Sequence, residues 1–184
     1  MTDALYTKAK ILSDISLDDL RHFSTTVDSE EARVTKQGGG IYHEFRKAKV
    51  KLISFMDFPD VCEEILDMIE LHRPKLIRNI HEIREFNYLC YDHGGHFIKH
   101  KDWLGRENGN QFENRIFSTI TLINRSEDLQ GGDLYIWEEE KGEPSIIQLD
   151  IGETVIFHSM KFHQVTPIVQ GTREVLVAWI YLKK

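Results

Sequence analysis

The sequence has little cysteine and no long apolar run. Its two cysteines, Cys62 and Cys90, form no CxxC pair, so neither is a good metal ligand, and we expect both to be thiols. No apolar run approaches the roughly 20 residues that span a bilayer. The stretch from Met1 to Asp14 lacks the basic and apolar regions of a secretory signal. These absences predict a cytoplasmic protein that does not cross a membrane.

An excess of basic residues is also absent, since the formal net charge is −7. This charge argues against a broad nucleic-acid surface, and we expect no nucleic-acid partner, although a local basic rim within Lys99–Arg115 stays open. The composition, with 41% hydrophobic and 29% charged residues, is ordinary for a globular protein. A length of 184 residues suits one domain with a substantial core.

The first 80 residues predict mostly helical or irregular structure. Ser16 is placed to cap a short helix through Leu17, Leu20 and Phe23. A second helix is expected over Pro59–Leu71, where apolar residues recur on one face and a proline follows. Between the two, Lys49–Phe55 has the pattern of a strand.

From about residue 83 the pattern changes to short strands separated by turns. The expected strands are Ile83–Tyr91, Phe97–Lys101, Ile116–Ile123, Asp133–Trp137, Ser145–Leu149, Thr154–His158, Phe162–Pro167 and Arg173–Leu182. Parallel strands need long crossovers, which these short connections exclude. We therefore expect a mainly β, α+β fold. Its core is a double-stranded β-helix (jelly roll) of about eight antiparallel strands over 83–184, supported by the N-terminal helices within 1–82.

His100 and Asp102 lie two residues apart at the end of an expected strand, so their side chains point the same way. An imidazole and a carboxylate on one face make two corners of a metal site, and His163 is the best third. Two histidines and one carboxylate form the facial triad of non-haem Fe(II) oxygenases. His158 is the rival third ligand, and His93 and His96, in a glycine-rich turn, are weaker candidates.

Arg173 begins a strand whose neighbours on the same face are Val175, Val177 and Trp179. A buried guanidinium without an anion would be unfavourable, and arginine binds carboxylates through two parallel hydrogen bonds. Arg173 therefore predicts a site for the far carboxylate of 2-oxoglutarate. We expect a hairpin about Gln170-Gly171, which would pair Arg173 with Thr166–Val169, a few residues from His163.

Taken together, these residues resemble the 2-oxoglutarate and Fe(II)-dependent oxygenases, in particular the prolyl 4-hydroxylase-like branch. The resemblance covers Tyr91 to Tyr181, about half of the chain. The matching positions are Tyr91, Gly94, Phe97, His100, Asp102, Arg115, Leu122-Ile123-Asn124, Gly131-Gly132-Asp133-Leu134, Gly152, Phe157, His163, Val165, Pro167, Val169, Gly171, Arg173 and Trp179.

The resemblance implies His100, Asp102 and His163 as iron ligands and Arg173 as the anchor of 2-oxoglutarate. It also implies that Tyr91 lies beside this cosubstrate, that O2 is the second one, and that L-ascorbate is associated with the activity. The resemblance further implies that Trp179 packs near the metal and that Arg115 matches an arginine that lines the substrate side in some members. We expect Arg115, Trp179 and, from the loop after Asp102, Trp103 to line the substrate.

Two departures from the family pattern concern the far carboxylate of the cosubstrate. Leu122 stands where several prolyl hydroxylases have a tyrosine, and Val175 stands where many members have serine or threonine. The hydroxyl that would assist Arg173 is therefore unassigned, with Thr119 or Thr121 as substitutes.

The implied reaction converts 2-oxoglutarate and O2 to succinate and CO2 and hydroxylates a substrate C–H bond. The expected substrate is a prolyl or other residue of a peptide or protein, and the alternative is a small metabolite such as an amino acid. A cupin-like metalloenzyme without an oxo-acid and a catalytically silent binding module are the rival interpretations. The polar loop of residues 103–114 is expected to close over the iron entrance. The oligomeric state is left open.

Overall fold

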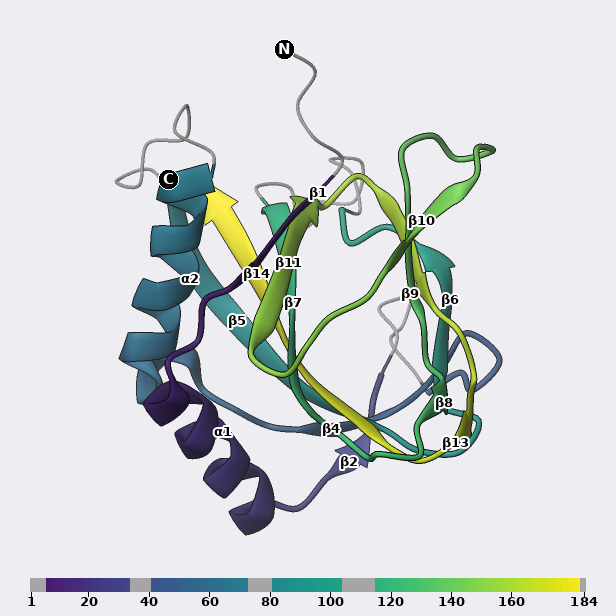
Figure 1. Ribbon diagram of the computed structural model, residues 1–184, viewed down its shortest axis with the longest axis horizontal. Helices are drawn as coiled ribbons and strands as arrows, with labels where there is room; N and C mark the ends of the chain where they lie inside the picture. The colour runs from purple at the N-terminus through teal and green to yellow at the C-terminus, as the bar shows by residue number, and fades with distance from the viewer. Residues whose placement is uncertain (1–5, 34–40, 73–80, 104–114, 183–184) are drawn as a thin grey trace.

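The computed structural model describes residues 6–33, 41–72, 81–103 and 115–182. Its strands form two larger antiparallel sheets and one small pair (Figure 1). The large sheet has the order β1 (Tyr6–Lys10), β11 (Glu153–His158), β7 (Arg115–Arg125), β14 (Arg173–Leu182), β5 (His81–Tyr91), β4 (Lys49–Lys51) and β2 (Glu30–Glu31). The small sheet has the order β10 (Pro144–Ile147), β9 (Leu134–Trp137), β12 (Phe162–Val165), β6 (His96–His100) and β3 (Arg46–Lys47). Strands β13 (Ile168–Gln170) and β8 (Gln130–Gly131) pair with each other.

The central strands β7 and β14 of the large sheet are buried on both faces, which explains why β14 is apolar almost throughout. Side chains of β14 alternate between two clusters. Val175, Val177 and Trp179 belong to the core between the two sheets, whereas Leu176 and Ala178 belong to the core under the helices. The inner core therefore lines the space that a jelly roll encloses, and the outer core fixes the large sheet from behind.

Helices α1 (Asp14–Thr26) and α2 (Pro59–His72) cover the outer face of the large sheet (Figure 1). Their apolar stripes supply Leu17 and Leu20 from α1 and Ile65 and Met68 from α2, all buried in the outer core. A short 3-10 turn, η1 (Phe55–Asp57), precedes α2. This packing leaves the inner face of the sheet free to carry a site.

The jelly-roll prediction is confirmed, and each of the eight predicted strands corresponds to a strand of the structure. Three details nearer the N-terminus were wrong. The cap of α1 is Ser13, whose Oγ accepts from the backbone N–H of Ser16, because the helix begins three residues earlier than predicted. The predicted strand over Lys49–Phe55 ends at Lys51. Tyr6–Lys10 forms a strand along the edge of β11 instead of irregular structure.

The predicted hairpin about Gln170-Gly171 was also wrong. Strand β12 belongs to the small sheet and β14 to the large sheet, so the chain crosses between sheets here. Gly171 has φ +80°, and a Cβ atom on it would lie 2.3 Å from Ser126 Oγ, so this crossing requires glycine. Arg173 consequently pairs with Tyr91 of β5 and Arg125 of β7.

Cys62 and Cys90 are both free thiols, as predicted. Burial raises the pKa of each thiol to about 11, with nearby acidic residues adding to the shift, so neither is a reactive thiolate at neutral pH. None of the helices that the structure describes is long and apolar enough to cross a membrane.

Candidate metal centre and anion pocket

Strand pairing in the small sheet brings the predicted metal ligands together. His100 ends β6, and His163 is its partner across the β6–β12 ladder. Asp102 follows two residues after His100, and its backbone N–H donates to Ser159 O at 3.1 Å, which fixes the chain there. One potential ligand atom from each of the three lies within 4.8 Å of the others. Within the described residues this is the cluster that could hold a metal ion.

Both imidazole rings present the same nitrogen to the cluster. His100 Nε2 lies 3.6 Å from Asp102 Oδ1, and His163 Nε2 lies 3.6 Å from Asp102 Oδ2. The Nδ1 atoms face backbone carbonyls instead, Ile98 O at 2.7 Å and Lys161 O at 3.2 Å. Carbonyls accept only, so Nδ1 carries the proton and the Nε2 lone pairs point at the centre. This is the tautomer that a metal ligand needs.

Two donors orient the Asp102 carboxylate. Ser118 Oγ donates to Oδ2 at 2.6 Å, and Trp179 Nε1 donates to the same atom at 3.0 Å. Burial alone would raise the pKa of Asp102, but His163, His100 and the Ser118 hydroxyl together hold it well below its usual range. The carboxylate is therefore ionised, as metal binding requires.

His163 is 4% exposed, and the Phe157 ring lies beside it with ring centroids 4.8 Å apart. Burial, together with the neighbouring His100, lowers the pKa of His163 to about 4. The imidazole is thus neutral at neutral pH. Two imidazoles and one carboxylate converging from one side are a donor set that fits a divalent ion such as Fe(II).

Histidine 158, the rival third ligand, lies on the other face of its strand. Phe157 points into the inner core and is adjacent in sequence, so His158 points away from the cluster. Its Nδ1 accepts from the backbone N–H of Met160 at 3.2 Å. The geometry therefore favours His163 over His158.

Arg115, expected to line the substrate, is buried behind the metal ligands. It donates to Asp102 O at 3.3 Å, to Tyr181 Oη at 3.0 Å and to Glu85 Oε2 at 3.0 Å. Its guanidinium also lies 4.2 Å from the centre of the Trp179 ring. Arg115 and Trp179 thus support Asp102 from two sides, and the substrate-lining role of both stays a prediction.

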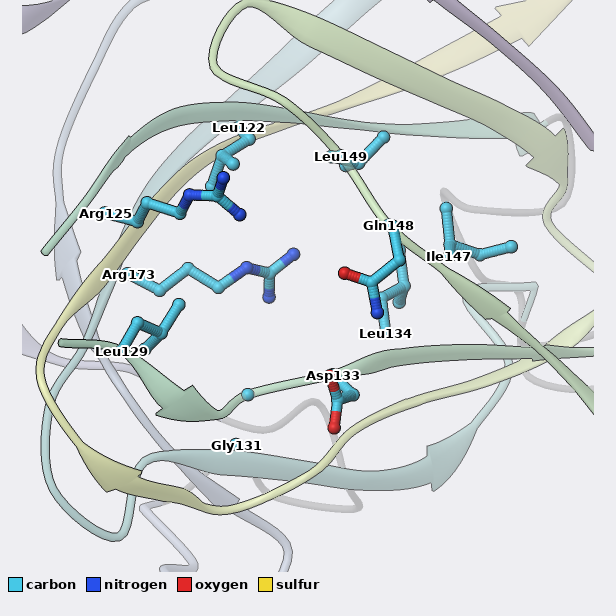
Figure 2. Close-up of a pocket in the computed structure, with 11 residues that line it drawn as sticks. Leu122, Arg125, Leu129, Gly131, Asp133, Leu134, Ile147, Gln148, Leu149 and Arg173 are labelled. Carbon is cyan, nitrogen blue, oxygen red and sulfur yellow. The ribbon is translucent and has the colours of Figure 1, made fainter. Parts of the chain in front are cut away.

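Arg173 points into a cavity of about 50 Å³ at the other end of β14 (Figure 2). Arg173 is 5% exposed, and its Nη1 atom is buried with no hydrogen-bond partner among the described residues. Burial lowers the pKa of Arg173, although Tyr91 and Asp133 act in the opposite direction. Arginine nevertheless keeps its charge at neutral pH. A buried guanidinium with an unpartnered N–H group is able to bind an anion.

Arg173 and Trp179 are six residues apart on the same face of β14, which corresponds to roughly 20 Å between their Cα atoms. Trp179 donates a hydrogen bond to Asp102 of the metal cluster, and Arg173 lines the cavity. The two candidate sites therefore lie along one inner surface of the jelly roll. Tyr91 is buried in the same inner core, opposite Arg173 in the ladder. Its predicted position beside the cosubstrate is compatible with this arrangement.

Thr119 and Thr121 do not face this cavity. They alternate with Ile120 and Leu122, which belong to the inner core, and so they point toward the helices. Thr119 Oγ1 donates to Ala178 O, and Thr121 Oγ1 bonds with Thr154 Oγ1. Their expected role as substitutes for the missing hydroxyl is wrong, because strand alternation places them on the opposite face.

Sequence reasoning missed three residues at these sites. Strand alternation could have identified Ser118, because it is two residues before Ile120 and so faces the same inner core. Arg125 and Gln148 line the Arg173 cavity and had no local signal. They lie in separate strands and connections that only folding brings together. Of the loop expected to act as a lid, residues 104–114 lie outside the described residues, whereas Trp103 is half-buried and donates its backbone N–H to Ser159 O.

Comparison with known proteins gives the same picture. The family model described as the 2OG-Fe(II) oxygenase superfamily matches residues 86–181, more than half of the chain. A PKHD-type hydroxylase of Synechococcus sp. (strain JA-2-3B'a(2-13)) is 29% identical over 108 residues, which are 59% of this chain and 45% of the relative. A PKHD-type hydroxylase of Prochlorococcus marinus (strain MIT 9515) is 34% identical over 117 residues, which are 60% of this chain and 51% of the relative. The chain thus spans about half the length of these curated relatives.

Solved structures share the fold over nearly the whole chain. A Pseudomonas putida prolyl-4-hydroxylase superposes with a TM-score of 0.71 at 16% identity, covering 98% of this chain and 94% of the other. A Trichoplax adhaerens prolyl hydroxylase, solved with a hypoxia inducible factor peptide fragment, gives 0.72 at 16% identity, covering 98% and 84%. The family description itself names 2-oxoglutarate and Fe(II), in agreement with the cofactors predicted from the residues. The chain belongs to the 2OG-Fe(II) oxygenase superfamily.

Proposed function

We propose that this protein is an Fe(II)- and 2-oxoglutarate-dependent dioxygenase that hydroxylates a C–H bond of its substrate. One observation carries the proposal. The cluster of His100, Asp102 and His163, whose geometry suits a metal ion, lies on the inner surface of the jelly roll. The same surface carries Arg173, a buried cation with an unpartnered N–H donor among the described residues. A metal site alone fits many enzymes, whereas the added cation calls for an anionic cosubstrate. This combination favours the oxygenase over a cupin-like metalloenzyme that uses no oxo-acid.

In this proposal each residue has a defined task. His100, Asp102 and His163 hold the metal on one side. Ser118 and Trp179 fix the orientation of the Asp102 carboxylate through their hydrogen bonds. Arg173 holds the far carboxylate of 2-oxoglutarate, which directs the oxo-acid end toward the metal. The iron, when bound, supplies the oxidative decarboxylation of 2-oxoglutarate with O2 and the transfer of an oxygen atom to the substrate.

For the substrate, we propose a residue of a peptide or protein, with proline preferred. The support comes from relatives. One structural relative is a prolyl hydroxylase solved with a peptide fragment, and the curated relatives are named hydroxylases. A small metabolite is the alternative. Hydroxylation of a peptide in a peptide screen would argue against it, and a screen in which no peptide is hydroxylated would favour it.

Decarboxylation of 2-oxoglutarate tests the proposal without knowledge of the substrate. Purified protein is incubated aerobically with Fe(II) and 2-oxoglutarate, and succinate and CO2 are measured. We expect both products from the wild-type protein and neither from His163→Ala. His158→Ala is the matched control, because it removes a histidine of β11, a strand of the other sheet, and the His158 side chain points away from the cluster. A wild-type protein that binds Fe(II) but forms no succinate, with or without candidate peptides, would contradict the proposal.

A further inference from the structure

The Arg173 cavity has a second arginine on its wall. Arg125 of β7 is the ladder partner of Arg173, and both side chains line the same cavity. Figure 2 shows the two guanidinium groups extending into it from the same side, with Gln148 opposite and Asp133 below. Two cations and one carboxylate leave the polar wall of the cavity with an excess of positive charge.

Neither arginine is neutralised well by the described residues. Asp133 favours the charged form of Arg173, but the Arg173 Nη1 atom is buried with no hydrogen-bond partner among the described residues. Arg125 has Asp150 at 3.8 Å, but the Asp150 side chain is 83% exposed, and so water screens this pair. Like charges that share a small cavity repel each other unless an anion lies between them. Two guanidinium groups on one wall therefore favour the binding of an anion in this cavity.

The apolar part of the wall explains why a second cation is needed. Leu122 lines the cavity and offers no hydroxyl, while Thr119 and Thr121 point to the other side of the sheet. A carboxylate has two oxygens with about four acceptor positions, more than one guanidinium fills. Arg125 is the residue on the wall whose side chain can supply further charged donors.

We propose that Arg125 is a second arginine for the far carboxylate of the cosubstrate, which binds between Arg125 and Arg173. This inference rests on the proposed function and deepens it. Arg173, deep in the wall, fixes the position of the carboxylate. Arg125, whose side chain is 43% exposed, lies nearer the solvent and binds the carboxylate from that side. Specificity for a dicarboxylate thus depends on two arginines from neighbouring strands.

Calorimetric titration of the Mn(II)-loaded protein tests this without turnover. Two probes are compared: 2-oxoglutarate, and 2-oxopentanoate, which has the same chain length but no far carboxylate. For Arg125→Leu we expect the Kd for 2-oxoglutarate to rise about 10-fold, as the loss of hydrogen bonds to a charged group predicts. The Kd for 2-oxopentanoate should not change. Arg125→Lys, which keeps the charge, should lie between the wild type and the leucine variant.

Arg84→Leu is the matched control. The Arg84 side chain is 36% exposed and forms an ion pair with Glu82. Arg84 lies near the first residues of β5, whereas Tyr91, the ladder partner of Arg173, is the last residue of that strand. It should bind both probes as the wild type does.

The outcomes separate this inference from the proposed function. An Arg125→Leu variant with unchanged affinity for 2-oxoglutarate would overturn the second-arginine role and leave the proposed function standing. Equal weakening for both probes would also overturn it, because the substitution would then act on the fold or the metal end. A wild-type protein that binds Mn(II) but not 2-oxoglutarate would overturn the proposed function and this inference together.

Discussion

The two ends of the inner surface differ in how far the protein satisfies them by itself. At the metal end the ligand side chains are already oriented, since both Nδ1 atoms and the Asp102 carboxylate have partners within the chain. At the arginine end, Arg173 Nη1 has none among the described residues. Contacts within the chain thus orient the metal end, whereas at the arginine end a buried donor has no such contact among the described residues. The following experiments test this difference, from the largest expected effect to the smallest.

Removal of a metal ligand should have the largest effect. His100→Ala, Asp102→Ala and His163→Ala should each abolish Fe(II)-dependent decarboxylation, because a facial site with two ligands does not keep its geometry. Succinate formation measures the loss, and Mn(II) titration should show weakened metal binding in the same variants. Full activity in His163→Ala together with loss in His158→Ala would show that the third ligand was assigned wrongly.

Loss of the anchoring cation should spare the metal end. Arg173→Ala should raise the 2-oxoglutarate concentration needed for half-maximal rate on the order of 100-fold, within the roughly 2–5 kcal/mol typical of truncating a buried charged pair. Mn(II) affinity should stay at the wild-type value. If the dependence of the rate on 2-oxoglutarate were unchanged, Arg173 would not be the anchor. The cupin-like metalloenzyme without an oxo-acid would then be the favoured interpretation.

Weakening the support of Asp102 should have a smaller effect, confined to the metal end. Ser118→Ala and Trp179→Phe each remove one hydrogen bond to Asp102 Oδ2, and we expect metal affinity to fall about 10-fold, at the low end for residues that orient a ligand. Metal titration measures it. A fall in 2-oxoglutarate affinity without a fall in metal affinity would mean that these side chains serve the other end.

The smallest effect should appear in the stability of the ligand-free protein. Arg173→Met replaces a buried, unsatisfied cation with an apolar side chain of similar length. We expect the free energy of unfolding to rise by about 1 kcal/mol, because replacement of buried charges by apolar groups is often stabilising. Urea unfolding without metal or cosubstrate measures the change, and Ser118→Ala should show no such gain. A destabilised Arg173→Met protein would indicate that the chain itself already satisfies the cation.

The sequence alone determined the eight core strands, the antiparallel class and the metal cluster. These depend on local signals: alternation and turn residues define strands, and the two-residue spacing of His100 and Asp102 places them on one face. His163 and Arg173 also came from their local pattern and the family resemblance. The assignment of single residues to iron or cosubstrate remains a prediction.

Only the tertiary structure decided which strands are neighbours. The turn at Gly171 is equally compatible with a hairpin and with a crossing between sheets, and the crossing places Arg173 between Tyr91 and Arg125. The same pairing brings Arg125 to the cavity and sends Thr121 to the helix side. Strand register is set by burial against distant residues. For this reason the local pattern predicted the strands and several site residues, whereas the walls of the anion pocket emerged only from the fold.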